Sequence, residues 1–144
     1  MAALSGPELA MIVDRALAEE MIAHARAELP NEACGIVAGK DGLPAHFYPT
    51  TNIEHSPTRF MVDGAEVLRV QREMRAHGWE MLAIFHSHTH TAAYPSSTDT
   101  NFAANWPDVY YLIASLQNEP PALRAFLVED GTVKEEEVAY RQEA

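Results

Sequence analysis

The histidines, serine and aspartate between residues 86 and 99 are the side chains of this sequence best suited to catalysis. His86 and His88 flank a single serine, and Ser96 and Asp99 follow them closely. Two imidazoles and one carboxylate are common zinc ligands, and three protein ligands leave the fourth tetrahedral position open for water, as in catalytic zinc sites. We therefore predict one zinc ion per chain, with His86, His88 and Asp99 as its ligands.

A zinc ion held in this way lowers the pKa of a bound water to about 7, so a hydroxide nucleophile becomes available at neutral pH. Each part of the pattern also has a simpler explanation. A His-x-His at the end of a strand is often two polar residues at a sheet edge, and Ser96 with Asp99 has the spacing of a capped helix start. A cap would hold Asp99 rigidly, so both explanations are compatible, and the combination favours a metal site.

The segment 81–85 predicts the strand that positions the histidines. It is apolar on both faces, as expected of a central strand. We expect this strand to end at residue 85, with a loop over 86–95 and a short helix over 96–104. Because side chains at i and i+2 point to the same face, His86 and His88 can reach one point, and Asp99 in the first turn of the helix can join them.

Two longer helices and several strands complete the predicted fold. Apolar residues recur at helical spacing along 15–29, and Pro30 ends that helix. Asp63 and Glu66 have the spacing of a capping box, which predicts a second helix ending near Gly78. The alternation of helices and strands predicts an α/β fold, with a mixed sheet flanked by helices. The predicted strands cover residues 9–13, 32–39, 45–51, 109–116, 123–129 and a segment after 131, with a turn at 40–42 and an extended piece at 59–62.

The composition is typical of one compact domain over residues 1–144. The chain is 47% hydrophobic and has a formal net charge of -11, which argues against nucleic acid or an anionic membrane surface as a partner. No apolar stretch approaches the roughly 18 residues that span a bilayer, and the N-terminus lacks the features of a secretory signal. With one cysteine and no internal disulfide, we expect a cytoplasmic protein.

Other catalytic chemistries fit the sequence less well. Cys34 lies in an apolar segment, so we expect it to be packed and not to act as a nucleophile. A zinc deaminase needs a Cys-x-x-Cys pair, which one cysteine excludes, and no His-Glu-x-x-His is present. We expect His55 and His90 in exposed loops, where a contact with substrate stays open. Tyr94 and Trp106 are candidates for lining a substrate groove, although core packing explains Trp106 better.

The spacing of the chemical residues resembles the JAMM motif of the MPN+ metalloproteases: His-x-His, seven residues, serine, two residues, aspartate. His86, His88, Ser96 and Asp99 match every position of that motif. The family also has an upstream Pro-x-Glu-x-Cys-Gly segment, which residues 30–35 match. The similarity continues at Thr51-Asn52, Ser56-Pro57 and residues 60–63, so it covers nearly the whole chain.

This resemblance implies a single MPN domain with a mostly antiparallel sheet and cytidine-deaminase-like layering. It also implies roles for the matched residues. The two histidines and Asp99 bind zinc, while Glu32 is the general base that passes a proton to the leaving amine. Ser96 stabilises the oxyanion of the tetrahedral intermediate, a role for which one donor contributes a factor of about 10²–10³ in rate.

One position departs from the family pattern: Thr89 follows the second histidine, where many members have proline. The surrounding residues resemble the bacterial Mec branch. That branch implies a small ubiquitin-like sulfur-carrier protein as partner, with a C-terminal Gly-Gly tail linked to cysteine or a few residues, and hydrolysis after the last glycine. Two alternatives stay open, a deubiquitinase-like isopeptidase acting on protein conjugates and a non-catalytic MPN scaffold. A homodimer is compatible with the sequence, which does not fix the oligomeric state.

Overall fold

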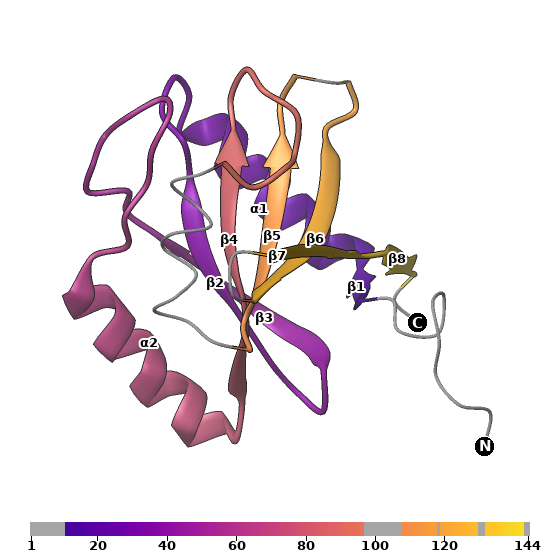
Figure 1. Ribbon diagram of the computed structural model, residues 1–144. Helices are drawn as coiled ribbons and strands as arrows, with labels where there is room; N and C mark the ends of the chain where they lie inside the picture. The colour runs from indigo at the N-terminus through magenta and orange to yellow at the C-terminus, as the bar shows by residue number, and fades with distance from the viewer. Residues whose placement is uncertain (1–10, 97–107, 118, 130–131, 143–144) are drawn as a thin grey trace.

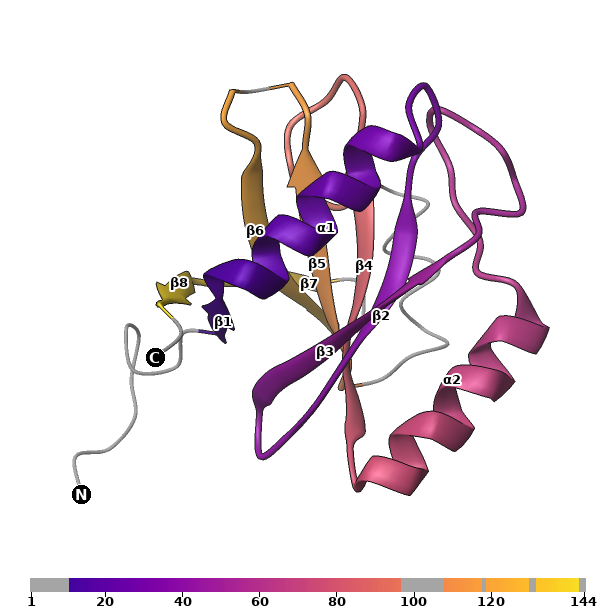
Figure 2. The ribbon, with the colours of Figure 1, turned by 180° about the vertical axis from the view of Figure 1, so that it is seen from behind.

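A computed structural model describes residues 11–96, 108–117, 119–129 and 132–142 of the chain. Its elements are β1 (Met11–Asp14), α1 (Arg15–Ala27), β2 (Cys34–Lys40), β3 (Leu43–Thr50), α2 (Gly64–His77), β4 (Glu80–His88), β5 (Tyr110–Ser115), β6 (Ala122–Glu129), β7 (Thr132–Glu136) and β8 (Val138–Arg141). Within this part of the chain, one sheet has the strand order β3-β2-β4-β5-β6-β7, and β1 pairs with β8 in a separate parallel ribbon. Helix α1 crosses one face of the main sheet, and α2 lies on the other side (Figures 1 and 2).

Strand β4 lies inside the sheet and divides the core into two layers. Ala83 and Phe85 pack on the side covered by α1, whereas Ile84 packs on the opposite side with Phe60 and Tyr111. β4 pairs antiparallel with β2 and parallel with β5, and the remaining neighbours in the main sheet are antiparallel. The predicted mixed, mostly antiparallel sheet flanked by helices is therefore confirmed.

The hairpin between β2 and β3 turns where the sequence predicts it. Lys40 pairs with Leu43, so the loop consists of Asp41 and Gly42 alone. Both residues have positive φ angles, 54° and 78°, as a two-residue type I′ hairpin loop requires. A glycine at the second position meets this requirement without steric cost.

Both long helices form; α1 ends two residues earlier than predicted, and α2 ends where the sequence predicts. Helix α1 ends at Ala27, so Leu29 lies beyond it and is exposed. Helix α2 ends at His77, and Gly78 follows it in the left-handed conformation expected of a C-terminal cap. The predicted capping box is wrong, because Asp63 makes no side-chain cap hydrogen bond. The Glu66 carboxylate instead accepts a hydrogen bond from the backbone N–H of Thr51, at 2.8 Å.

The strand that carries the histidines is longer than predicted. β4 does not stop at residue 85 but continues through His88, because residues 86–88 pair with residues 113–115 of β5. The two histidines therefore belong to the sheet and not to a loop. The helix predicted for 96–104, together with Asp99 and Trp106, lies outside the described residues.

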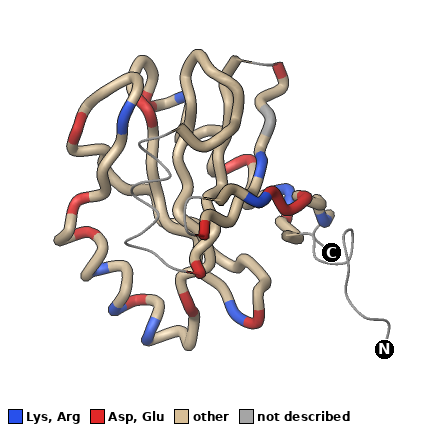
Figure 3. The backbone as a smooth tube through the Cα atoms, in the orientation of Figure 1, with Lys and Arg blue, Asp and Glu red and all other residues tan. Residues whose placement is uncertain are grey.

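Charged residues are frequent on both helices, in the β2–β3 turn and on the C-terminal strands, and are scarce on the middle strands β4 and β5 (Figure 3). On β6 and β7, Arg124 makes two hydrogen bonds to the carboxylate of Glu135, and these hold the pKa of Glu135 below its usual value. In the described segments, no helix is both long and apolar enough to cross a membrane.

We predict that Gly35→Ala destabilises the fold. A methyl group at this position would lie 2.5 Å from Cε1 of Phe47 and 2.7 Å from the backbone oxygen of Tyr48. Such overpacking lowers the free energy of unfolding by about 1–3 kcal/mol, which urea denaturation can measure. Gly64→Ala is the matched control, because a methyl group there meets nothing within 4 Å. Equal stability of the two variants would contradict the prediction.

Candidate metal-dependent active site

His86 and His88 face each other on the same side of β4. Their Nε2 atoms are 3.1 Å apart, and both side chains are buried. Two nitrogens bound to one tetrahedral zinc ion at about 2.0–2.1 Å lie roughly 3.3 Å apart, so the observed separation fits a shared metal ion. His86 is further held by stacking on Phe60, with ring centroids 4.3 Å apart.

A backbone carbonyl fixes the chemical form of His88. Its Nδ1 lies 2.8 Å from the carbonyl oxygen of Ala92. A carbonyl only accepts, so Nδ1 carries a proton, and in the neutral form of the ring the lone pair of Nε2 is directed toward His86. Metal-binding histidines typically donate their second ring nitrogen in this way. The ring therefore has the orientation and tautomer of a metal ligand.

Glu32 precedes β2, and its backbone is held from two directions. On one side, the Ala33 N–H donates to Oγ of Ser87 at 2.8 Å and the Ser87 N–H donates to the Ala33 carbonyl at 3.0 Å. On the other side, the Glu32 N–H donates to the carbonyl of Ser56 at 2.8 Å, and Nδ2 of Asn52 donates to the Glu32 carbonyl at 3.0 Å. Ser87 separates the two histidines in sequence, so the strand with the imidazoles also positions the carboxylate.

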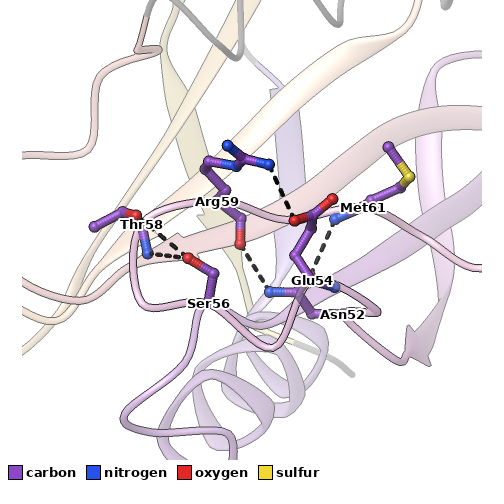
Figure 4. A network of polar contacts seen from close by, with 6 residues as sticks. All are labelled: Asn52, Glu54, Ser56, Thr58, Arg59 and Met61. Atoms are coloured by element: carbon purple, nitrogen blue, oxygen red, sulfur yellow. Dashed lines mark hydrogen bonds and ion pairs between the residues drawn. The ribbon is translucent and has the colours of Figure 1, made fainter.

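Asn52 organises the loop from 52 to 62 around Glu32. Its Nδ2 donates to the carbonyls of Glu32 and Arg59, and its Oδ1 accepts from the N–H groups of Glu54 and Met61, all at 2.9–3.0 Å. Figure 4 shows the partners within the loop, Glu54, Arg59 and Met61. The side chain is only 3% exposed, so its four bonds replace water for the buried amide. Sequence reasoning gave Asn52 no role beyond the family resemblance, because an asparagine after a strand is typical of any turn.

A groove of about 240 Å³ brings the candidate residues together. It is lined by Glu32, Pro57, Thr58, His88, Thr89, His90, Thr91 and Ser96. Glu32 is buried at the groove, whereas Ser96 is exposed at it. The carboxylate of Glu32 and the hydroxyl of Ser96 therefore share one groove with His88 of the His-x-His pair.

The remaining candidate residues divide into three groups. His55 and His90 are exposed, as expected, and His90 lines the groove. Tyr94 is 51% exposed and packs edge-on against Phe126, and it is not among the groove residues. Asp99 is outside the described residues, among which no group of three His, Cys, Asp or Glu side chains is placed to hold a metal ion. Asp99 as third ligand stays a prediction.

Cys34 is packed, as the sequence indicates. It has no exposed surface, and its Sγ lies 3.3 Å from Oγ1 of Thr50. Burial raises the pKa of the thiol to about 12. Since the thiolate is the nucleophilic form, this cysteine is unsuited to nucleophilic catalysis at neutral pH.

Comparison with known proteins gives the family. Residues 14–128 match the family model described as prokaryotic homologs of the JAB domain. The chain belongs to this family. It is 40% identical over 136 residues to a CysO-cysteine peptidase of Mycobacterium tuberculosis, covering 92% of each chain. It is 32% identical to a probable TtuB-protein conjugate cleaving protease of Thermus thermophilus, covering 85% of this chain and 79% of that protein.

Solved structures agree with this assignment. A protein of Desulfitobacterium hafniense is 41% identical, with a TM-score of 0.84 over 92% of this chain and 93% of that one. A structure described as a JAMM metalloprotease-like zinc site in the proteasome and signalosome has a TM-score of 0.60 at 13% identity, covering 92% of this chain and 99% of that one. The second likeness concerns the fold alone. The JAB/MPN fold expected from the sequence is confirmed.

We predict that Cys34 resists alkylation in the folded protein. With a pKa of about 12 and no exposed surface, almost none of the thiol is both ionised and accessible at pH 8. Mass spectrometry after iodoacetamide treatment should show an unmodified chain under native conditions and one adduct in urea. Equal labelling rates in the two conditions would contradict this.

We predict that Asn52→Asp destabilises the loop from 52 to 62. A carboxylate keeps the acceptor for Glu54 and Met61 but loses both donors, which leaves the Glu32 and Arg59 carbonyls without this partner. The free energy of unfolding should fall by about 1–3 kcal/mol, measured by urea denaturation. Ser56→Ala is the control in the same loop, since it removes only a hydroxyl bonded to exposed Thr58. A fall no larger than that of the control would refute the role given to Asn52.

Proposed function

We propose that this chain is a zinc-dependent peptidase that hydrolyses the amide bond after the C-terminal glycine of a ubiquitin-like sulfur-carrier protein. Its product would be the free carrier together with cysteine or a short peptide. The observation that carries the proposal is that the imidazoles of His86 and His88 and the side chain of Glu32 lie at one site. His88 and Glu32 line the same groove, and Nε2 of His86 lies 3.1 Å from Nε2 of His88.

Each candidate residue can be given one chemical role in this reaction. His86 and His88 would hold the zinc ion, and Asp99 is the proposed third ligand. Zinc in such a site lowers the pKa of water and polarises a carbonyl. Glu32 takes a proton from the attacking water and delivers it to the nitrogen of the leaving group. Ser96, exposed at the same groove, donates its hydroxyl to the developing oxyanion.

The groove and the relatives support a peptide tail as substrate. The groove is small and is lined mostly by threonine, histidine and serine side chains, so it suits an extended chain without bulky side chains. The mycobacterial relative is named for CysO-cysteine, and this chain covers 92% of it at 40% identity. A cytoplasmic reaction is consistent with the buried free cysteine.

A second candidate function is cleavage of protein conjugates at an isopeptide bond. The Thermus relative is named for TtuB-protein conjugates, and a 27% identical relative of Pyrococcus furiosus is named desampylase. Both reactions break an amide after the tail of a ubiquitin-like protein. They differ only in the leaving amine, which is cysteine in one case and a lysine side chain in the other.

We expect the zinc-loaded protein to release cysteine from CysO-cysteine. Mass spectrometry of the carrier measures this release. Glu32→Gln should lower kcat by about 10²–10⁴-fold, because the variant lacks the proton acceptor. His86→Ala should lose bound zinc as measured by metal analysis. His77→Ala is the matched control, because His77 is exposed at the end of α2, before β4 begins, whereas His86 and His88 lie at the other end of that strand.

The outcomes separate the candidates. No cysteine release by the wild type, or full activity in Glu32→Gln, would refute the proposed peptidase. Faster cleavage of a lysine-linked carrier conjugate than of CysO-cysteine would favour the isopeptidase. Absence of stoichiometric zinc together with absence of both activities would favour a non-catalytic scaffold.

A further inference from the structure

Thr89 makes two hydrogen bonds with one hydroxyl. Its Oγ1 lies 3.1 Å from the carbonyl oxygen of Pro57 and 2.8 Å from Nδ1 of His90. The hydroxyl has one proton, which goes to the carbonyl because a carbonyl only accepts. Oγ1 therefore accepts from His90, and Nδ1 of His90 carries the proton. In the neutral form of the ring, the Nε2 atom on the opposite edge then has a lone pair.

The bond from Thr89 to Pro57 joins the two sides of the groove. Pro57 and Thr58 come from the loop between β3 and α2, whereas residues 88–91 come from the end of β4 and the segment that follows. Thr89 is only 8% exposed, so its hydroxyl is shielded from competing water. The bond therefore limits how far the two walls can separate.

The wall that carries His90 is also braced from behind by the end of β5. Three successive residues at this end of β5 donate hydrogen bonds to backbone carbonyls of residues 88–91. These bonds restrain the backbone that carries His90. The bonds run from the N–H of Leu116 to His88 (3.0 Å), from Nε2 of Gln117 to His90 (3.3 Å) and from Oγ of Ser115 to Thr91 (2.6 Å). A site on a rigid wall selects its ligand more sharply than one on a mobile loop.

The groove lining indicates which substrate groups can be recognised. Among the eight described residues that line it, Glu32 is the one with a carboxylate, and none is lysine or arginine. Recognition of a glycine tail therefore depends on neutral hydrogen bonds to its backbone, because glycine has no side chain to bind. An imidazole nitrogen with a lone pair is an acceptor suited to a backbone N–H.

We propose that Thr89 and His90 form the specificity element of this groove. Thr89 sets the groove width, so that residues without a side chain are preferred beside the scissile bond. His90 accepts a hydrogen bond at Nε2 from an N–H of the bound tail. The inference rests on the proposed peptidase function and names the two residues that select its substrate.

The test uses zinc-loaded protein, full-length CysO-cysteine and a CysO-cysteine whose last glycine is changed to alanine. Thr89→Val removes the hydroxyl at constant shape, and Thr89→Ser keeps it. His90→Ala removes the acceptor at an exposed position; it also removes the donor to Oγ1 of Thr89, whose bond to Pro57 remains. Steady-state kinetics give kcat and KM, and calorimetry with Glu32→Gln as background gives the affinity for uncleaved CysO-cysteine.

We expect Thr89→Val to raise KM and weaken binding by about tenfold, the equivalent of one good hydrogen bond, with little change in kcat. Its preference for glycine over alanine should fall, and Thr89→Ser should restore both properties. His90→Ala should raise KM by a similar factor. A variant that only loosened the fold would not change the ratio of glycine to alanine cleavage.

Wild-type activity separates failure of the proposed peptidase function from failure of the proposed specificity element. If the wild type cleaves neither substrate, the proposed peptidase function itself fails. If it cleaves CysO-cysteine but Thr89→Val keeps the wild-type KM and glycine preference, or His90→Ala keeps the wild-type KM, the specificity element is refuted. Should Thr89→Val not fold at the assay temperature, His90→Ala decides the matter alone.

Discussion

The pairing of β2 with β4 is the constraint on which the candidate site depends. Cys34 lies opposite His86 in this antiparallel pair, and Ser87 bonds to both the N–H and the carbonyl of Ala33 just beyond it. Side chains alternate along a strand, so a shift of the pairing by one residue would turn the histidines to the α1 face and separate them from Glu32. The buried apolar residues on both faces of β4 make such a shift costly. Packing of the core thus determines the geometry of the chemical groups.

The loop from 52 to 62 has to satisfy the hydrogen bonding of backbone groups outside regular secondary structure. It has to leave the sheet edge, pass beside Glu32 and return to α2, with several backbone groups removed from water. Asn52 satisfies four of these groups, and the isolated bridge from Asn52 to Val62 closes the loop at its base. Polar side chains that complete the hydrogen bonding of buried backbone are expected where regular structure ends. The rigidity of this loop therefore comes from hydrogen bonds, whereas that of β4 comes from packing.

Sequence patterns predicted the sheet and the paired histidines well, because the signals involved are local. An apolar run such as 81–85 and an i, i+2 pair such as His86 and His88 have direct structural meaning. The sequence patterns did not predict features that depend on a contact with a residue distant in sequence. β4 extends to His88 because β5 pairs with it, and Glu66 bonds to Thr51 instead of capping its own helix. The role of Asn52 depends on four contacts across the loop and on the approach of Glu32, none of which leaves a periodic signal.

The proposed function therefore assigns the chemistry and the selection of substrate to different parts of the fold. The imidazole pair and the backbone of Glu32 are fixed by paired strands, whose register tolerates little change. Both walls of the groove come from connecting segments, where sequence and length vary more readily among homologues. Family relatives named for CysO-cysteine and for TtuB-protein conjugates, at 40% and 32% identity to this chain, fit this division. If the proposed roles hold, a change of wall residues such as Thr89 would alter the choice of leaving group without disturbing β4, the strand that carries His86 and His88.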